Sequence, residues 1–234
     1  MALLIVLAFS MMMLPGCGED PGEAVFQKGR WIDLTHSFSE ETIYWPTARP
    51  FEHDTVHFGE TPAGYFYAAY NFCAAEHGGT HMDAPIHFAK GQRSADQVPL
   101  GSLIGPAVVV NVADKAQENR DYQVSVNDLE NWEKVYGPIP KGAIVLLNTG
   151  YAKYWPDAEK YMGTAERGQE AVAKLHFPGL HPDAAKWLTQ KEIAAVGLDT
   201  PSIDYGQSTQ FESHQILFKA NIPAFENVAN ISEL

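Results

Sequence analysis

Three apolar runs in the middle of the chain predict buried strands. They cover residues 107–112, 143–148 and 193–198, and Pro, Gly or charged residues lie beside them. Apolar runs of this length without polar alternation are typical of strands that are buried on both faces. We also expect a short strand at Trp31–Thr35 and an aromatic strand within residues 64–76.

Helical signals lie between and after these runs. A Ser-x-x-Asp capping box opens a predicted helix over residues 125–136, and Gly-Pro ends it. A proline in the first turn favours a helix over residues 182–191, and residues 213–220 predict a shorter one. The Gly-rich segment 151–180 is interpreted as a long, partly structured loop. Strands that alternate with helices in one continuous pattern indicate a single α/β domain.

Composition narrows the classes of partner. The 234 residues are 45% hydrophobic and 19% charged, which is ordinary for a globular protein. Sixteen basic against 29 acidic residues give a net charge of −13. No basic stripe is available to neutralise phosphates or anionic lipid, so we expect no nucleic-acid partner and no basic membrane-binding face.

The N-terminal segment indicates export. Residues 2–14 form an apolar run that is short for a membrane span, and a polar stretch follows it. We therefore expect a signal peptide over residues 1–17, a linker over 18–29 and the folded domain over 30–234. The sequence Leu-Pro-Gly-Cys at its end resembles a bacterial lipobox, which would place a lipid anchor on Cys17 as the only membrane attachment. A misjudged start codon and a eukaryotic signal peptide are the alternatives.

A histidine-rich segment carries the strongest chemical signal. Residues 77–88 read HGGTHMDAPIHF, with His77, His81, Asp83 and His87 all at odd positions. Residues two apart in an extended chain face the same side, so these four side chains can converge. Imidazole and carboxylate suit Zn²⁺ and Mn²⁺, and three protein ligands beside an open position are typical of a catalytic site. A helix would also align the His-x₃-His pair, but the glycines and the proline disfavour one.

Further polar residues lie late in the chain. Glu226 follows an apolar, strand-like segment, an unusual place for a charge unless it meets a cation. His214 stands nearby in the predicted last helix, and each of the two is a weak signal alone. Asp199 and Asp204 lie just beyond the third buried strand, where α/β proteins place site residues, although Asp199 also suits a turn.

The motif His-x-Gly-Thr-His-x-Asp-x-Pro-x-His-Phe at residues 77–88 resembles the metal motif of the cyclase-like metal hydrolases, the family of bacterial kynurenine formamidase and isatin hydrolase. The likeness extends to residues 31–35, 44–46 and 198–204 and to the pair His214 and Glu226. It implies an α/β fold of the swivelling β/β/α type and a homodimer. The family usually continues beyond Glu226 through another strand, so we expect either a truncated gene model or the absence of the last C-terminal strand here.

The resemblance also assigns roles to residues. His77, His81 and Asp83 are implied as metal ligands. Asp83 and Glu226 are implied to share a second ion with His214. The cofactor is then one or two ions of Zn²⁺ or Mn²⁺. The resemblance makes His87 the general acid/base and implies that Trp45 stacks on an aromatic substrate.

These residues suit hydrolysis of an amide by a metal-activated water, and the resemblance implies an aryl or cyclic amide such as isatin or N-formylkynurenine. His87 lies four residues past Asp83, near enough to move a proton without acting as a ligand. Trp45, Tyr44, Phe66 and Phe88 are expected to form an apolar wall for a flat, small aromatic amide.

Two other classes of protein remain open. A serine or cysteine hydrolase is disfavoured, because the chain has no Gly-x-Ser-x-Gly elbow and Cys73 lies in an aromatic strand pattern that predicts a small buried side chain. A non-catalytic exported metal- or ligand-binding protein on the same fold is the main alternative. Metal analysis combined with a panel of amide substrates separates it from an enzyme.

Overall fold

The computed structural model describes residues 29–234. The predicted signal peptide, the lipobox and nearly all of the expected linker therefore lie outside the described residues. Residues 33–234 form one compact unit. Among the helices of the described chain, none is both long and apolar enough to cross a bilayer.

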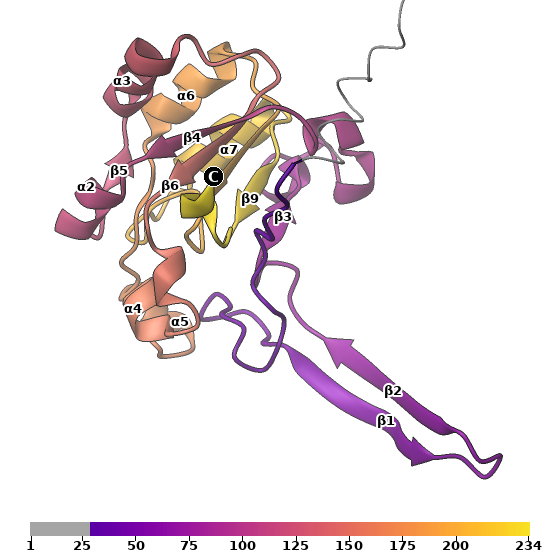
Figure 1. Ribbon diagram of the computed structural model, residues 1–234. Helices are drawn as coiled ribbons and strands as arrows, with labels where there is room; N and C mark the ends of the chain where they lie inside the picture. The colour runs from indigo at the N-terminus through magenta and orange to yellow at the C-terminus, as the bar shows by residue number, and fades with distance from the viewer. Residues whose placement is uncertain (1–28) are drawn as a thin grey trace, which may run out of the picture. The chain divides into compact units, whose positions relative to one another are not determined.

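A five-stranded mixed sheet occupies the centre of this unit (Figure 1), with the strand order β3-β9-β8-β6-β4. Its strands are β3 (His81–Asp83), β9 (Ala224–Glu226), β8 (Ala195–Leu198), β6 (Ile144–Asn148) and β4 (Ala107–Asn111). Four strands run parallel, whereas β3 pairs antiparallel with β9 at one edge. Every residue of β6 and β8 is buried, as their apolar sequences predict. The α/β class expected from the sequence is confirmed.

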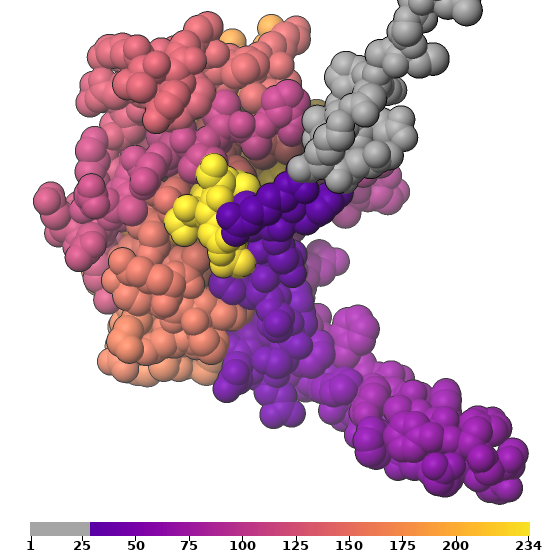
Figure 2. Space-filling model, viewed as in Figure 1, coloured from indigo at the N-terminus to yellow at the C-terminus, as the bar shows by residue number. Residues whose placement is uncertain are grey.

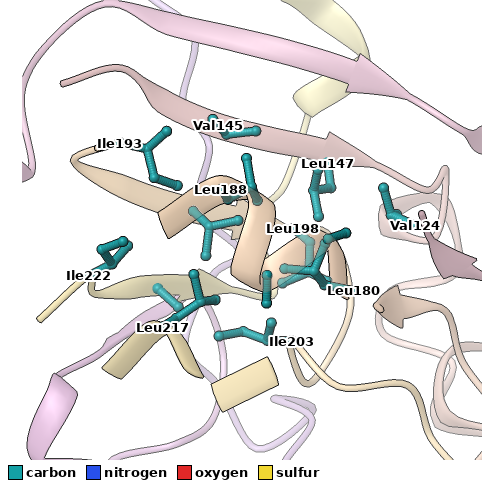
Figure 3. Close-up of a cluster of buried hydrophobic side chains, with 14 of the residues drawn as sticks. Val124, Val145, Leu147, Leu180, Leu188, Ile193, Leu198, Ile203, Leu217 and Ile222 are labelled. Carbon is teal, nitrogen blue, oxygen red and sulfur yellow. The ribbon is translucent and has the colours of Figure 1, made fainter. Parts of the chain in front are cut away.

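The long helices pack on this sheet. They are α3 (Val126–Tyr136), α6 (Pro182–Gln190) and α7 (Glu212–Lys219). Figure 3 shows Leu147 and Leu198 from the strands packed with Leu188 of α6 and Leu217 of α7 in one buried apolar cluster. The predicted capping box is present at the start of α3, and Pro182 stands in the first turn of α6.

Short elements connect these layers. The short helices are α2 (Ala113–Glu118), α4 (Ala158–Met162) and α5 (Gln169–Val172), and β5 (Gln123–Val124) pairs with β7 (Gly179–Leu180). Single 3₁₀ turns are η1 (Pro85–His87), η2 (Ala95–Gln97), η3 (Leu100–Ser102), η4 (Ala152–Tyr154) and η5 (Ile231–Glu233). The structured part of the segment predicted as a long, partly structured loop thus includes two helices. Asp157 caps α4, and Gly163, which adopts the left-handed conformation, ends it.

A long hairpin extends away from the central sheet (Figures 1 and 2). Its strands β1 (Glu52–Glu60) and β2 (Phe66–Cys73) pair only with each other. Large apolar side chains are exposed along it: Val56, Phe58, Phe66, Tyr67, Tyr70 and Phe72.

The hairpin corrects the prediction that Cys73 is buried, because Cys73 is exposed. The aromatic pattern identifies a strand correctly, but this strand does not join the central sheet. The strand predicted at Trp31–Thr35 is also wrong. No ladder forms there, and Leu34 accepts a single backbone hydrogen bond from Ala229.

Candidate metal centre and active site

The ends of two neighbouring strands bring the histidine-rich segment to the sheet edge. His81 and Asp83 are two residues apart on β3, and His81 lies directly opposite Glu226 on β9. Residues 76–80 before β3 form bends around a single bridge at Gly78, and the chain turns into η1 after β3, so a helical arrangement of His77 and His81 is excluded. Gly78 is required here, because a Cβ at this position would lie 2.0 Å from the Tyr44 ring.

Asp83 lies at the centre of the cluster and is only 1% exposed. Asp83 Oδ1 lies 2.6 Å from His77 Nδ1 and 3.0 Å from His81 Nε2. Asp83 Oδ2 lies 3.4 Å from His214 Nε2 and 3.9 Å from His87 Nε2. Each oxygen of the Asp83 carboxylate therefore has two imidazole nitrogens within 4 Å.

Glu226 supplies a second buried carboxylate between two of these histidines. Glu226 Oε1 lies 3.1 Å from His214 Nε2, and Oε2 lies 3.5 Å from His81 Nε2. The Ile203 amide donates to Glu226 Oε1 at 2.8 Å and so helps to fix the orientation of the carboxylate. The six polar residues identified from sequence are thus brought together, although they come from distant parts of the chain.

Asp204 orients His214. Asp204 Oδ2 lies 2.6 Å from His214 Nδ1 and also accepts the His214 amide, while Oδ1 accepts the Ser213 amide. The carboxylate thus satisfies free amides in the first turn of α7 and turns His214 Nε2 toward Asp83 and Glu226. The sequence places Asp204 only at a strand exit, and nothing in its spacing reveals the contact with His214.

Asp199 has a different position. Its carboxylate accepts hydrogen bonds from Thr149 and from the amides of Tyr151 and Ala152, which hold the loop after β6. Burial raises the pKa of Asp199. Of the two sequence interpretations, the structure supports the turn residue.

The buried carboxylates set the protonation of the histidines. Burial lowers the pKa of His81, but the contact with Asp83 and the charge of Glu226 outweigh it and raise this pKa to about 9. Burial likewise opposes protonation of His214, yet contacts with Asp204, Asp83 and Glu226 raise its pKa. Burial and the charge of Asp83 raise the pKa of Glu226. The two buried carboxylates thus favour the protonated, positively charged forms of His81 and His214.

His87 lies at the open side of the cluster. Its ring stacks on His77 at 3.8 Å between centroids, and its side chain is 35% exposed. Burial, together with the neighbouring histidines, lowers the pKa of His87 to about 4, despite the opposing charge of Asp83. His87 is therefore a neutral imidazole at neutral pH.

A pocket of about 290 Å³ opens onto these groups. Trp45 and Phe88, expected to contact substrate, line it together with Tyr44. Phe66, expected in the same wall, lies instead on the exposed hairpin, which corrects that prediction. Phe211, not identified from sequence, completes the wall at 5.2 Å from the Phe88 ring.

The donor set fits a divalent cation. Ligand atoms of His81, Asp83 and Glu226 lie within 4.8 Å of one another. Those of His77, Asp83 and His87 do so as well, a grouping in which His87 would be a ligand rather than a proton carrier. Among residues 29–234, His81 Nε2 and Asp83 Oδ2 are buried without a hydrogen-bond partner, although both face the cluster. Buried atoms of this kind need a partner, and imidazole with carboxylate is the ligand chemistry of Zn²⁺ and Mn²⁺.

Comparisons with known proteins agree with this site. The family model described as "Putative cyclase" matches residues 32–205. The isatin hydrolase of Roseibium aggregatum is 28% identical over 179 residues, which are 73% of this chain and 66% of that protein. The kynurenine formamidase of Bacillus cereus is 26% identical over 198 residues, covering 85% of this chain and 81% of that protein.

Solved structures show the same likeness. Isatin hydrolase A from Ralstonia solanacearum superposes with a TM-score of 0.79 at 27% identity, covering 98% of this chain and 89% of that one. Isatin hydrolase A from Labrenzia aggregata has the same TM-score and identity and covers 91% of this chain and 86% of its own. The chain therefore belongs to the cyclase family of metal-dependent hydrolases.

Proposed function

We propose that the protein is a metal-dependent amidohydrolase that opens or cleaves an aryl or cyclic amide of the isatin or N-formylkynurenine kind. One observation carries the proposal: a buried cluster of histidines and carboxylates lies at the base of an aromatic pocket. The relatives named as isatin hydrolase and kynurenine formamidase support this class of reaction.

His77, His81 and Asp83 would hold one ion, and His214 with Glu226 and the second oxygen of Asp83 would hold another. The two oxygens of Asp83 face different histidines, which supports this division. We propose Zn²⁺ or Mn²⁺, because both suit mixed imidazole and carboxylate ligands. Such an ion polarises an amide carbonyl and lowers the pKa of water.

His87 would move the proton. Its Nε2 lies 3.9 Å from Asp83 Oδ2, beyond hydrogen-bonding distance, so this nitrogen is not engaged by the carboxylate. The ring borders the pocket beside Asp83. A neutral imidazole in this place can accept a proton from water and donate it to the leaving nitrogen.

The pocket would select a flat substrate. The ring centroids of Trp45 and Phe88 lie 6.2 and 5.2 Å from that of Phe211. The three rings together form an apolar wall beside the polar cluster. An aromatic ring can pack against these faces while its amide reaches Asp83 and His87.

We further propose that the protein is an exported homodimer. The exposed apolar side chains of the hairpin support self-association, since such patches commonly mark protein interfaces. Export, and a lipid on Cys17, are supported by the apolar N-terminal sequence alone, which precedes the described residues.

Metal removal followed by substrate assays tests the proposal. The protein is stripped with a chelator, reloaded with Zn²⁺ or Mn²⁺, and offered isatin, N-formylkynurenine and a simple lactam. We expect hydrolysis of an aryl or cyclic amide that disappears with the metal and returns with it. Tight metal binding without hydrolysis of any substrate would instead favour the non-catalytic binding protein, which the comparisons do not favour.

A further inference from the structure

Asn227 connects the two strands that carry the metal-binding candidates. It follows Glu226 directly, is 3% exposed, and has a left-handed backbone with φ of +52°. Its side-chain amide donates to the Gly79 carbonyl at 2.8 Å, and its own carbonyl accepts from Thr80 Oγ1 at 2.6 Å. Asn227 thus holds both residues that immediately precede His81.

The Gly79 carbonyl also determines how His81 presents its ring. His81 Nδ1 lies 3.0 Å from Gly79 O, and a carbonyl accepts only from a protonated nitrogen. His81 Nε2 is then the nitrogen that faces Asp83 and Glu226. Asn227 and His81 therefore share one carbonyl, so displacing Gly79 O affects the hydrogen bond that orients the His81 ring.

Tyr161 fixes the direction of the Asn227 amide. The buried Tyr161 hydroxyl donates to Asn227 Oδ1 at 2.9 Å, and the Asp199 carbonyl, at 3.1 Å, is the other acceptor within reach of this one proton. With Oδ1 facing this hydroxyl, the amide nitrogen of Asn227 is directed at Gly79. A residue on α4 thereby supports the sheet edge that carries the site.

We infer that Asn227 is a positioning residue for the metal: it holds His81 and Glu226 in register by clamping the Gly79–Thr80 segment, with Tyr161 behind it. The inference rests on the metal site proposed above. Asn is suited to the position, because it tolerates the left-handed backbone and carries both a donor and an acceptor.

Metal affinity of Asn227→Asp tests the inference. This change keeps the size of the side chain but places an oxygen where Gly79 O needs a donor. Titration of the metal-free protein with Mn²⁺ should show affinity about 10- to 100-fold weaker than in the wild type, as for other partners that orient metal ligands. The absorption spectrum of bound Co²⁺ should also change, because His81 is oriented differently.

Asn221→Asp is the matched control. Asn221 has a similar left-handed backbone, with φ of +57°, but its side chain bonds to Gln92 and the Arg93 amide rather than to the Gly79–Thr80 segment. We expect its Mn²⁺ affinity and Co²⁺ spectrum to match the wild type.

Tyr161→Phe removes only the hydroxyl and should weaken Mn²⁺ binding in the same direction, by several-fold. It decides the question if Asn227→Asp does not fold. Wild-type affinity and an unchanged Co²⁺ spectrum in a folded Asn227→Asp protein would overturn the inference, as would wild-type affinity in Tyr161→Phe where that variant decides. A wild-type protein that binds no Mn²⁺ or Co²⁺ would instead contradict the proposed metal site itself.

Discussion

His81 and Glu226 lie directly opposite each other across the β3–β9 pair, with His81 Nε2 3.5 Å from Glu226 Oε2. His81 belongs to the first half of the sequence and Glu226 to its last ten residues. Their contact requires β9 to pair with β3 at the edge of the sheet. The cluster is therefore a property of the completed sheet.

Replacing His87 by alanine should abolish turnover while the bound metal remains. His87 borders the pocket but lies 3.9 Å from the nearest oxygen of Asp83, so its loss removes a proton carrier and leaves the buried donors in place. General acid–base groups contribute about 10²- to 10⁴-fold to rate. Turnover and metal content are measured on the same sample. Loss of metal together with activity would show that His87 is a ligand.

Asp204→Asn should weaken metal binding by roughly 10- to 100-fold, because the amide no longer supplies the charged acceptor that orients His214. Asp199→Asn provides the control. It removes an equally buried carboxylate that holds the loop after β6 and does not contact the cluster. Calorimetric metal titrations should separate the two variants. Equal losses of affinity would assign Asp204 a general structural role.

Trp45→Ala should raise KM for an aromatic amide by about tenfold and change kcat little, since roughly 1.4 kcal/mol of apolar contact is lost away from the reacting atoms. Trp45 lines the pocket but is absent from the groups of candidate metal ligands. Trp187→Ala, on α6 and outside the pocket, should leave KM unchanged. A fall in kcat alone would place Trp45 nearer the chemistry than proposed.

Replacing Phe58 and Phe72 by serine should convert a dimer into a monomer in light scattering, because 66% and 74% of these side chains are exposed on the hairpin. Val135 and Tyr136, 72% and 71% exposed on α3, provide a matched pair. Their replacement by serine should leave the mass unchanged. A monomeric wild type at micromolar concentration would contradict the dimer.

Stability should fall on acidification partly through His36. Burial lowers the pKa of His36 to about 4 from the ordinary 6.5. Between these values the unfolded chain binds the proton more readily than the folded chain, so the free energy of unfolding decreases as pH falls from 6.5 toward 4. In urea unfolding, His36→Gln should flatten this decrease, and an unchanged pH dependence in this variant would contradict the role of His36.

Much of the sheet and its helices follows from local sequence. The strands β6 and β8 are apolar runs buried throughout, whereas the apolar run of β4 lies at the sheet edge with both ends exposed. Helices α3 and α6 carry their own start signals. Such signals depend on only a few neighbouring residues, so they can be interpreted from a single sequence. The shared face of His81 and Asp83 also follows from alternation along a strand, whereas His77 reaches Asp83 through the bends around Gly79.

Contacts between distant parts of the chain do not follow from local sequence. The hairpin has the apolar composition of a buried strand, and only its place outside the central sheet explains why Cys73 is exposed. Asp204 and Phe211 reach the site through the turn before α7, where Phe211 adopts a left-handed backbone with φ of +51°. No periodic pattern encodes that turn.

The paired buried carboxylates also make the stability of the protein depend on the concentration of free metal. Asp83 and Glu226 lie together with 1% and 3% exposure, so a cation bound only by the folded protein relieves their repulsion. Linkage then adds about 2.7 kcal/mol to the free energy of unfolding at free metal 100 times the dissociation constant. Differences of this size change the abundance of a protein in cells several-fold, because unfolded chains are degraded. Through Asp83 and Glu226, the amount of this protein would follow the metal supply of its compartment.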